Sequence, residues 1–144
     1  MSSETETSQE VVDGTSVVAL FKEYYHIPVL AALLAFMLWL RILPAENFIR
    51  PDGVYFSGND AWYHLRETTY VVKNWPFTMP FDPWTQFPYG VSNSQFGTLY
   101  DQIVATVALV VGLGDPSQRQ IATTLLYAPA VFGVLTALPV YFVG

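Results

Sequence analysis

Three side chains that could bind a metal ion stand at helical spacing near the middle of the chain. Asp60, His64 and Glu67 occupy positions i, i+4 and i+7. A helix would therefore place all three on one face. Two carboxylates and an imidazole are a donor set that divalent metal ions accept.

The residues alone leave three interpretations of this face open. In the first, Asp60 interacts with the helix dipole and forms a simple i, i+4 pair with His64. In the second, Asp60, His64 and Glu67 form a compact metal site. In the third, Asp60 alone, at the mouth of a tight glycine turn, is one ligand of a divalent ion such as Mg²⁺ or Mn²⁺, whose other ligands come from elsewhere.

Local signals mark the two ends of the helix that would carry these residues. Ser57 or Asn59 could cap its start, because a side-chain oxygen there can accept a hydrogen bond from a free backbone N–H group. Trp75-Pro76 should end it, because proline cannot continue a helix.

The composition is that of a membrane protein. Of the 144 residues, 52% are hydrophobic and 12% are charged, about half the charged share of a soluble domain. The net charge of −6 leaves no basic surface for a phosphate backbone, so we expect no nucleic-acid partner. The chain has no cysteine, which excludes a disulfide framework and a Cys-ligated zinc site.

The N-terminal part should be an acidic tail followed by a membrane span. Residues 1–23 begin with Glu, Asp, Ser and Thr and little apolar surface, which predicts a disordered tail. Residues 24–43 are apolar and long enough for a first transmembrane helix. Pro44 should stop that helix.

A second span is predicted at the C-terminal end, over residues 120–144, where Pro129 and Pro139 should kink the helix. The apolar run between the spans is only about a dozen residues long, so we expect a short interfacial helix over about 101–113. This arrangement leaves residues 44–119 on one side of the membrane.

Five runs in this chain resemble one enzyme family. They are GNDAWYHLR (58–66), NWP (74–76), FDPWTQFPYG (81–90), LYDQ (99–102) and GDPS (114–117). In this order they resemble the first external loop of the catalytic subunit of archaeal oligosaccharyltransferase, the dolichyl-phosphooligosaccharide–protein glycotransferase. The resemblance implies an all-α polytopic membrane protein of the glycosyltransferase C-type architecture. This chain would hold its first two transmembrane helices and its first extracytoplasmic loop, as an N-terminal fragment in the cell membrane.

The resemblance also implies a reaction and a site. The family transfers an oligosaccharide from a dolichyl phosphate or diphosphate carrier to Asn in Asn-X-Ser/Thr sequons of an acceptor protein. Its first loop carries an acidic motif that takes a Gly-x-Asp form in many archaeal members, here Gly58-Asn59-Asp60. By resemblance, Asp60 is catalytic, binds Mn²⁺ or Mg²⁺ and contacts the acceptor peptide. His64 and Arg66 would support the loop.

The run FDPWTQFPYG has two interpretations. In the structural one, prolines stiffen the loop, Gly90 closes a turn and the aromatic rings pack against the membrane face. In the functional one, the rings contact a lipid-linked sugar. The rings are those of Phe81, Trp84, Phe87 and Tyr89.

Two other functions remain as alternatives. One is another polytopic transferase that uses a lipid-linked sugar, such as a protein O-mannosyltransferase, although the pairing of GNDAWYHLR with FDPWTQFPYG argues against it. The other is a non-catalytic membrane subunit or a transporter, in which the loop is only a docking surface. The resemblance implies that the family's second acidic motif and its sequon-recognising domain lie beyond Gly144, so the fragment is not expected to be active alone. Its single carboxylate should also bind a divalent ion only weakly.

Overall fold

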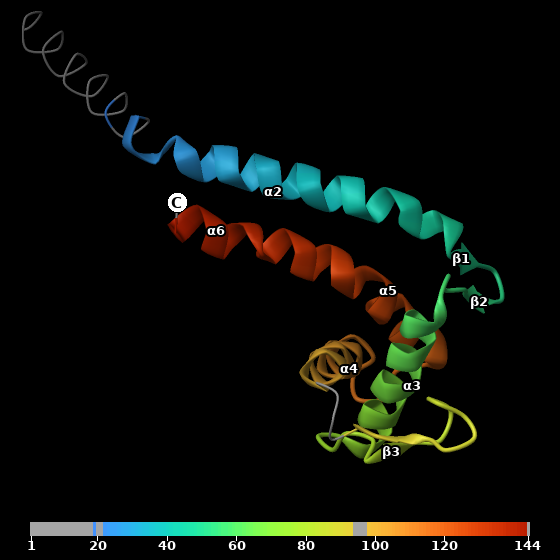
Figure 1. The fold of residues 1–144 in the computed structure, drawn as a ribbon. Helices are drawn as coiled ribbons and strands as arrows, with labels where there is room; N and C mark the ends of the chain where they lie inside the picture. Colours follow the sequence, from blue (N-terminus) through green and yellow to red (C-terminus); the bar gives the residue numbers. More distant parts are fainter. Residues whose placement is uncertain (1–18, 20–21, 94–97, 144) are drawn as a thin grey trace, which may run out of the picture. The chain divides into compact units, whose positions relative to one another are not determined.

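The computed structural model describes residues 19, 22–93 and 98–143, so most of the predicted acidic tail lies outside the described residues. The chain divides into two compact units, Met1–Trp39 and Leu40–Gly144. The elements, in chain order, are α2 (His26–Ile42), η1 (Leu43–Asn47), β1 (Ile49–Arg50), β2 (Gly53–Val54), α3 (Asn59–Asn74), β3 (Phe81–Asp82), β4 (Val91–Ser92), α4 (Leu99–Val111), α5 (Gln118–Leu135) and α6 (Ala137–Val143) (Figure 1).

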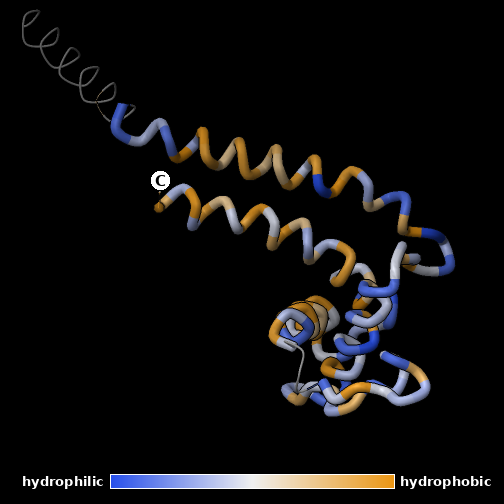
Figure 2. The backbone as a smooth tube through the Cα atoms, viewed as in Figure 1, coloured by the Kyte–Doolittle hydropathy of each residue, from blue (hydrophilic) through white to orange (hydrophobic). Residues whose placement is uncertain are grey.

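Helix α2 is almost entirely apolar, and none of its residues is buried (Figure 2). It ends at Ile42 and passes into the 3-10 helix η1, which has Pro44 in its first turn. The predicted end of the helix at Pro44 is thus confirmed. Proline causes it because it lacks the N–H group that would continue the α-helix. The helical stretch Lys22–Asn47 is 26 residues long, enough to cross a membrane.

Helices α5 and α6 form a second apolar stretch, Gln118–Val143, also 26 residues long. Ser117 caps it: the Ser117 side chain accepts a hydrogen bond from the Gln120 backbone N–H, and the Gln120 side chain accepts one from the Ser117 backbone N–H at 2.8 Å. This reciprocal capping box satisfies backbone groups that a helix end leaves free.

The two prolines of this stretch differ in their effect. Pro129 lies inside α5 without interrupting it, whereas the α-helix is interrupted at Thr136, three residues before Pro139. Pro139 has no N–H group to donate to the carbonyl four residues earlier, which explains a break at that point.

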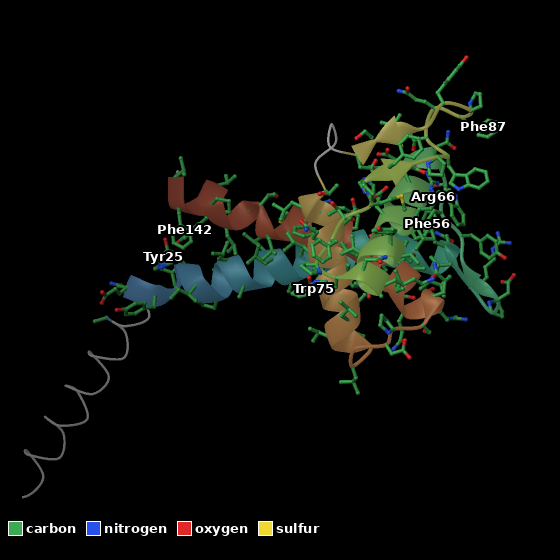
Figure 3. All side chains as sticks on the ribbon, turned by 90° about the horizontal axis from the view of Figure 1, so that it is seen from below. Tyr25, Phe56, Arg66, Trp75, Phe87 and Phe142 are labelled. Carbon is green, nitrogen blue, oxygen red and sulfur yellow. The ribbon has the colours of Figure 1, made fainter. Side chains whose placement is uncertain are left out.

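Helices α3, α4 and α5 pack together as the core of the second unit. Figure 1 looks along α4 while α5 runs across the view, and Figure 3, turned by 90°, shows α4 along its length, again across α5. At about 1.5 Å per residue, α4 is roughly 20 Å long, too short to cross the hydrocarbon core of a bilayer. The contact residues are mostly small or branched: Val71, Val104, Ala105, Ala108, Ile121, Ala122 and Leu125 are buried.

Two short antiparallel strand pairs, β1 with β2 and β3 with β4, flank α3 along the chain. The fold is therefore mostly helical and not all-α as predicted. The strands were not predicted because strands of two residues leave no periodicity in the sequence. Gly90 closes the turn before β4 with φ of 69°, and a side chain there would collide with the ring of Phe81. The predicted turn at Gly90 is thus confirmed.

The arrangement of α4 across α5 leads to a topology prediction. The chain has no cysteine of its own, so single cysteines at Ser16, Ser57 and Asp115 provide clean probes in an otherwise cysteine-free full-length protein. If α4 does not span, Ser57→Cys and Asp115→Cys should both react with an impermeant thiol reagent added from outside, and Ser16→Cys should react only after permeabilisation. Reaction of Ser57→Cys without reaction of Asp115→Cys would mean that α4 crosses the bilayer.

Candidate active site on helix α3

Helix α3 begins at Asn59, directly after Gly58, which has φ of 94°. Glycine suits this left-handed conformation because it has no Cβ atom to clash. No side-chain cap is present, so the predicted cap by Ser57 or Asn59 is wrong: the N-cap position is Gly58 itself. Asp60 lies in the first turn as predicted, where its negative charge interacts favourably with the helix dipole.

The Asp60 side chain is exposed, and within the described residues its carboxylate makes no hydrogen bond or ion pair. It lines two clefts. We call the first the polar cleft, of about 490 Å³, which is lined by Asn59, Asp60, Trp62, Tyr63, Arg66, Trp84, Thr85 and Gln86. We call the second the apolar cleft, of about 580 Å³, which is lined by Phe48, Phe56, Ser57, Asp60, Ala61, His64, Tyr100, Leu125, Leu126 and Pro129. Asp60 is the one residue that both clefts share.

The first interpretation predicted an i, i+4 pair of Asp60 with His64, and this pair is not formed. The Nδ1 atom of His64 lies 2.9 Å from Oδ1 of Asp101, a fully buried residue of α4, and the same oxygen accepts a hydrogen bond from Thr68 Oγ1 at 3.3 Å. The hydrogen bond with Asp101 raises the pKa of His64, although burial opposes the shift. A buried carboxylate is the stronger partner because electrostatic interactions strengthen away from water.

Glu67 does not join Asp60 in a metal site. Its side chain is fully buried, and Oε1 accepts a hydrogen bond from Nδ2 of Asn93 at 2.5 Å. Burial raises the pKa of Glu67, which favours the neutral acid. The described part of the chain contains no group of three or more His, Asp or Glu side chains placed to hold a metal ion. The interpretation as a compact metal site is therefore wrong. Helix α3 places Asp60, His64 and Glu67 on one face, but Glu67 is buried beneath a neighbouring segment whereas Asp60 is exposed to solvent.

Arg66 connects α3 to the aromatic loop, which we define as residues 81–90. Its Nη2 atom donates to Oδ2 of the fully buried Asp82 at 2.7 Å. The hydroxyl of Thr85 donates to the same oxygen at 2.5 Å, and the backbone N–H of Trp84 donates to Oδ1 at 3.0 Å. Burial alone would raise the pKa of Asp82, but these hydrogen bonds, from Arg66 foremost, hold the pKa below its usual range.

The rings of the aromatic loop are largely exposed in the described chain, so the predicted packing against a membrane face stays a prediction. The side chains of Trp84, Phe87 and Tyr89 are 68%, 74% and 87% exposed. The rings of Trp84 and Phe87 stack on each other, with centroids 6.5 Å apart and planes inclined by 19°. Figure 3 shows Phe87 at the outer end of the loop, beyond Arg66.

Sequence reasoning missed Asp82, Asp101 and Asn93. The available signal was the setting of the two acids: Asp82 stands between aromatic and proline residues, and Asp101 stands directly before an apolar run. A carboxylate in such surroundings requires a partner if it is buried.

Comparison with known proteins assigns the family. Residues 27–144 match the family model described as oligosaccharyl transferase STT3, N-terminal. The chain belongs to the STT3 family. The family resemblance predicted from the loop motifs is thus confirmed, and membrane localisation is supported by the two long apolar helices.

Curated archaeal proteins of this family are similar in sequence. The chain is 59% identical over 129 residues to dolichyl-monophosphooligosaccharide–protein glycotransferase AglB of Haloferax volcanii, a match that covers 90% of this chain and 12% of that protein. It is 34% identical over 121 residues to dolichyl-phosphooligosaccharide–protein glycotransferase 3 of Archaeoglobus fulgidus, covering 84% of this chain and 14% of the relative. No solved structure shows significant similarity. The chain thus spans only a small part of the length of these relatives.

The pair of His64 and Asp101 should make stability depend on pH. Because the pKa of His64 is raised on folding, the pair stabilises the fold fully below the ordinary histidine pKa, and this contribution is lost as the pH rises through the raised value. In the full-length protein, Asp101→Asn should therefore lower the free energy of unfolding by about 1.5–3 kcal/mol at pH 6 and by less at pH 9.

Thermal unfolding midpoints of detergent-solubilised wild type and variant at the two pH values measure this difference. Asp115→Asn is the matched control, because it removes the same charge at an exposed position. A destabilisation by Asp101→Asn that is equal at both pH values would show that His64 is not charged in the pair.

Proposed function

We propose that this chain forms the N-terminal part of an archaeal oligosaccharyltransferase, in which Asp60 is the catalytic carboxylate. The enzyme would transfer an oligosaccharide from a dolichyl phosphate or diphosphate carrier to the Asn side chain of an Asn-X-Ser/Thr sequon. Membership of the STT3 family and the names of the archaeal relatives support this proposal. The observation that carries it is the position of Asp60, exposed at the start of α3 and shared by two clefts of different chemistry.

The reaction explains why a free carboxylate is needed at this position. The nitrogen of the acceptor amide is a poor nucleophile, because its lone pair is delocalised into the carbonyl group. A carboxylate that accepts a hydrogen bond from the amide N–H weakens this delocalisation and stabilises the charge that develops during transfer. A carboxylate already paired within the fold, such as that of Asp82 or Asp101, could not do this.

The Asp60 carboxylate also fits as one ligand of Mg²⁺ or Mn²⁺. Such ions prefer oxygen ligands and commonly bind one or two carboxylates together with water and substrate phosphate. When bound, the ion would neutralise negative charge on the departing phosphate. The other acids of α3 and α4 face inward, so the remaining ligands would come from water, from the substrate and from parts of the protein outside this chain.

His64 and Arg66 would act as supporting residues. Each joins a buried carboxylate, His64 to Asp101 on α4 and Arg66 to Asp82 at the aromatic loop. Together these contacts hold α3, and with it the first turn that presents Asp60. While these contacts are made, neither side chain is free to act on a substrate.

The proposal includes a topology. Residues 44–119 would form the extracytoplasmic loop between two spans, with α4 in the membrane interface. The length and direction of α4 and the two long apolar helices support this arrangement. Asp60 would then face the compartment in which acceptor proteins receive the glycan, and membrane lipid would surround α2, α5 and α6.

Substitution of Asp60 tests the proposed function in the full-length enzyme. Asp60→Ala should lower the rate of glycan transfer to a sequon peptide by at least about 10²-fold, as expected for loss of an electrostatic contact made in the transition state. Folding should be nearly unaffected, because loss of a first-turn acid costs only about 0.3–1 kcal/mol. Transfer is measured with purified lipid-linked donor, and the amount of folded protein by size-exclusion chromatography.

Two further variants separate catalysis from structure. Asp115→Ala removes an exposed carboxylate that lines neither cleft, and it should leave transfer unchanged. His64→Ala should lower activity only in proportion to the loss of folded protein. If Asp60→Ala behaves like His64→Ala, the catalytic role of Asp60 is wrong; recovery of Asp60→Glu at raised Mn²⁺ or Mg²⁺ would support the proposed metal contact.

A further inference from the structure

The two clefts beside Asp60 differ in the way that the two ends of a lipid-linked sugar differ. The apolar cleft reaches α5 through Leu125, Leu126 and Pro129, in a helix apolar enough to cross a membrane. The polar cleft contains no residue of α5 and shares only Asp60 with the apolar cleft. A lipid-linked sugar has an apolar chain on one side of its phosphate and a hydroxyl-rich ring on the other. With the phosphate beside Asp60, the chain matches the apolar cleft and the ring matches the polar cleft.

Trp84 is held in the polar cleft as an open aromatic surface. Its backbone N–H donates to the buried carboxylate of Asp82, which Arg66 of α3 also binds, so its position relative to α3 is fixed. Phe87 stacks against one side of the indole, yet the Trp84 side chain remains 68% exposed. The negative face of an aromatic ring attracts the weakly positive C–H groups on the face of a sugar. A fixed and exposed indole beside a reacting centre is suited to that contact.

Gln86 adds a polar group to the same cleft from a strained position. Its φ of 55° is in the left-handed region, which side chains other than those of Gly, Asn and Asp rarely adopt. Its carbonyl accepts a hydrogen bond from the Tyr89 backbone N–H at 3.1 Å, which closes the turn. The amides of Gln86 and Asn59 line the cleft and can donate and accept, as sugar hydroxyls do. Strain retained at a ligand-facing position is typical of binding sites.

Apart from Asp60, the lining of the polar cleft carries no uncompensated charge and favours an uncharged part of a ligand. The guanidinium of Arg66 is paired with Asp82, so this cation is compensated. The remaining lining groups are aromatic rings, amides and a hydroxyl, apart from Asp60 at the edge that the two clefts share. Hydroxyl groups match such a lining.

We propose that the polar cleft is the glycan subsite of the donor, with Trp84 as the platform for a sugar ring near the phosphate and Gln86 as a hydrogen-bonding partner of its hydroxyls. This inference rests on the proposed function, because it takes the reacting centre to be at Asp60. It makes Trp84 a donor-binding residue, and the acceptor peptide would then reach Asp60 from outside the polar cleft.

Steady-state kinetics of the full-length enzyme test the subsite. Trp84→Ala should raise the KM for the lipid-linked donor by about tenfold, as expected for loss of an aromatic contact. The KM for the sequon peptide and kcat at saturating donor should stay within about threefold of wild type. Trp84→Phe retains a ring and should recover most of the donor affinity.

Tyr89→Ala is the matched control within the same loop. Tyr89 is 87% exposed and lines neither cleft, so its removal should leave the donor KM unchanged. Gln86→Gly separates strain from binding: glycine relieves the backbone but removes the amide, so the donor KM should rise while thermal stability is retained or increased.

The outcomes distinguish this inference from the proposed function. If Asp60→Ala is inactive and Trp84→Ala leaves the donor KM unchanged, Asp60 keeps its role and the subsite is wrong. If Trp84→Ala raises the KM of the peptide instead, the polar cleft belongs to the acceptor and the inference is overturned. Equal losses in Trp84→Ala and Tyr89→Ala would assign both effects to the structure of the loop and would also overturn it.

Discussion

The buried carboxylate of Asp101 holds α3 against α4, and the placement of the candidate site depends on it. A buried charge is costly unless hydrogen bonds and an opposite charge compensate it. Here both partners, His64 and Thr68, come from successive turns of α3, so the contact fixes the rotation of this helix about its axis. Asp60 lies one turn before His64 on the same face. It therefore points toward the same side but remains exposed, beyond the reach of the partner that pairs His64.

A second ion pair holds α3 from another direction. Arg66 follows His64 by two residues, which at about 100° per residue places it roughly 200° further around the helix. Its partner Asp82 organises the aromatic loop by accepting hydrogen bonds from Thr85 and from the backbone of Trp84. Helix α3 is thus the common support of α4 and the loop, and the polar cleft lies along the side where Arg66 meets the loop. Removing the partner of either buried carboxylate would leave that carboxylate without an opposite charge, which should destabilise the fold.

The sequence predicted what depends on local pattern and could not predict what depends on distant partners. Hydropathy and proline positions indicated both long apolar helices, and the end of α3 at Trp75 followed from Pro76. The loop motifs indicated the family. The partner of His64 lies 37 residues away, and a nearer acid at i−4 was the obvious alternative. The two clefts likewise depend on side chains from the aromatic loop and from α5, and no spacing rule connects these segments to Asp60.

The distribution of charge around α3 bears on how a metal ion would bind. Asp82 is paired with the Arg66 cation, Asp101 accepts hydrogen bonds from α3, and the raised pKa of Glu67 favours its neutral form, so each buried acid near α3 has a compensating group or a tendency to be neutral. If Asp60 binds a divalent cation as proposed, it would attract the ion mainly through its own single charge, and one carboxylate holds such an ion weakly. A phosphate brought by the donor would supply the missing oxygen ligands. Because coupling between two ligands is reciprocal, metal should strengthen donor binding by the same factor as donor strengthens metal binding. Such coupling would keep the site largely empty of metal until the lipid-linked substrate arrives.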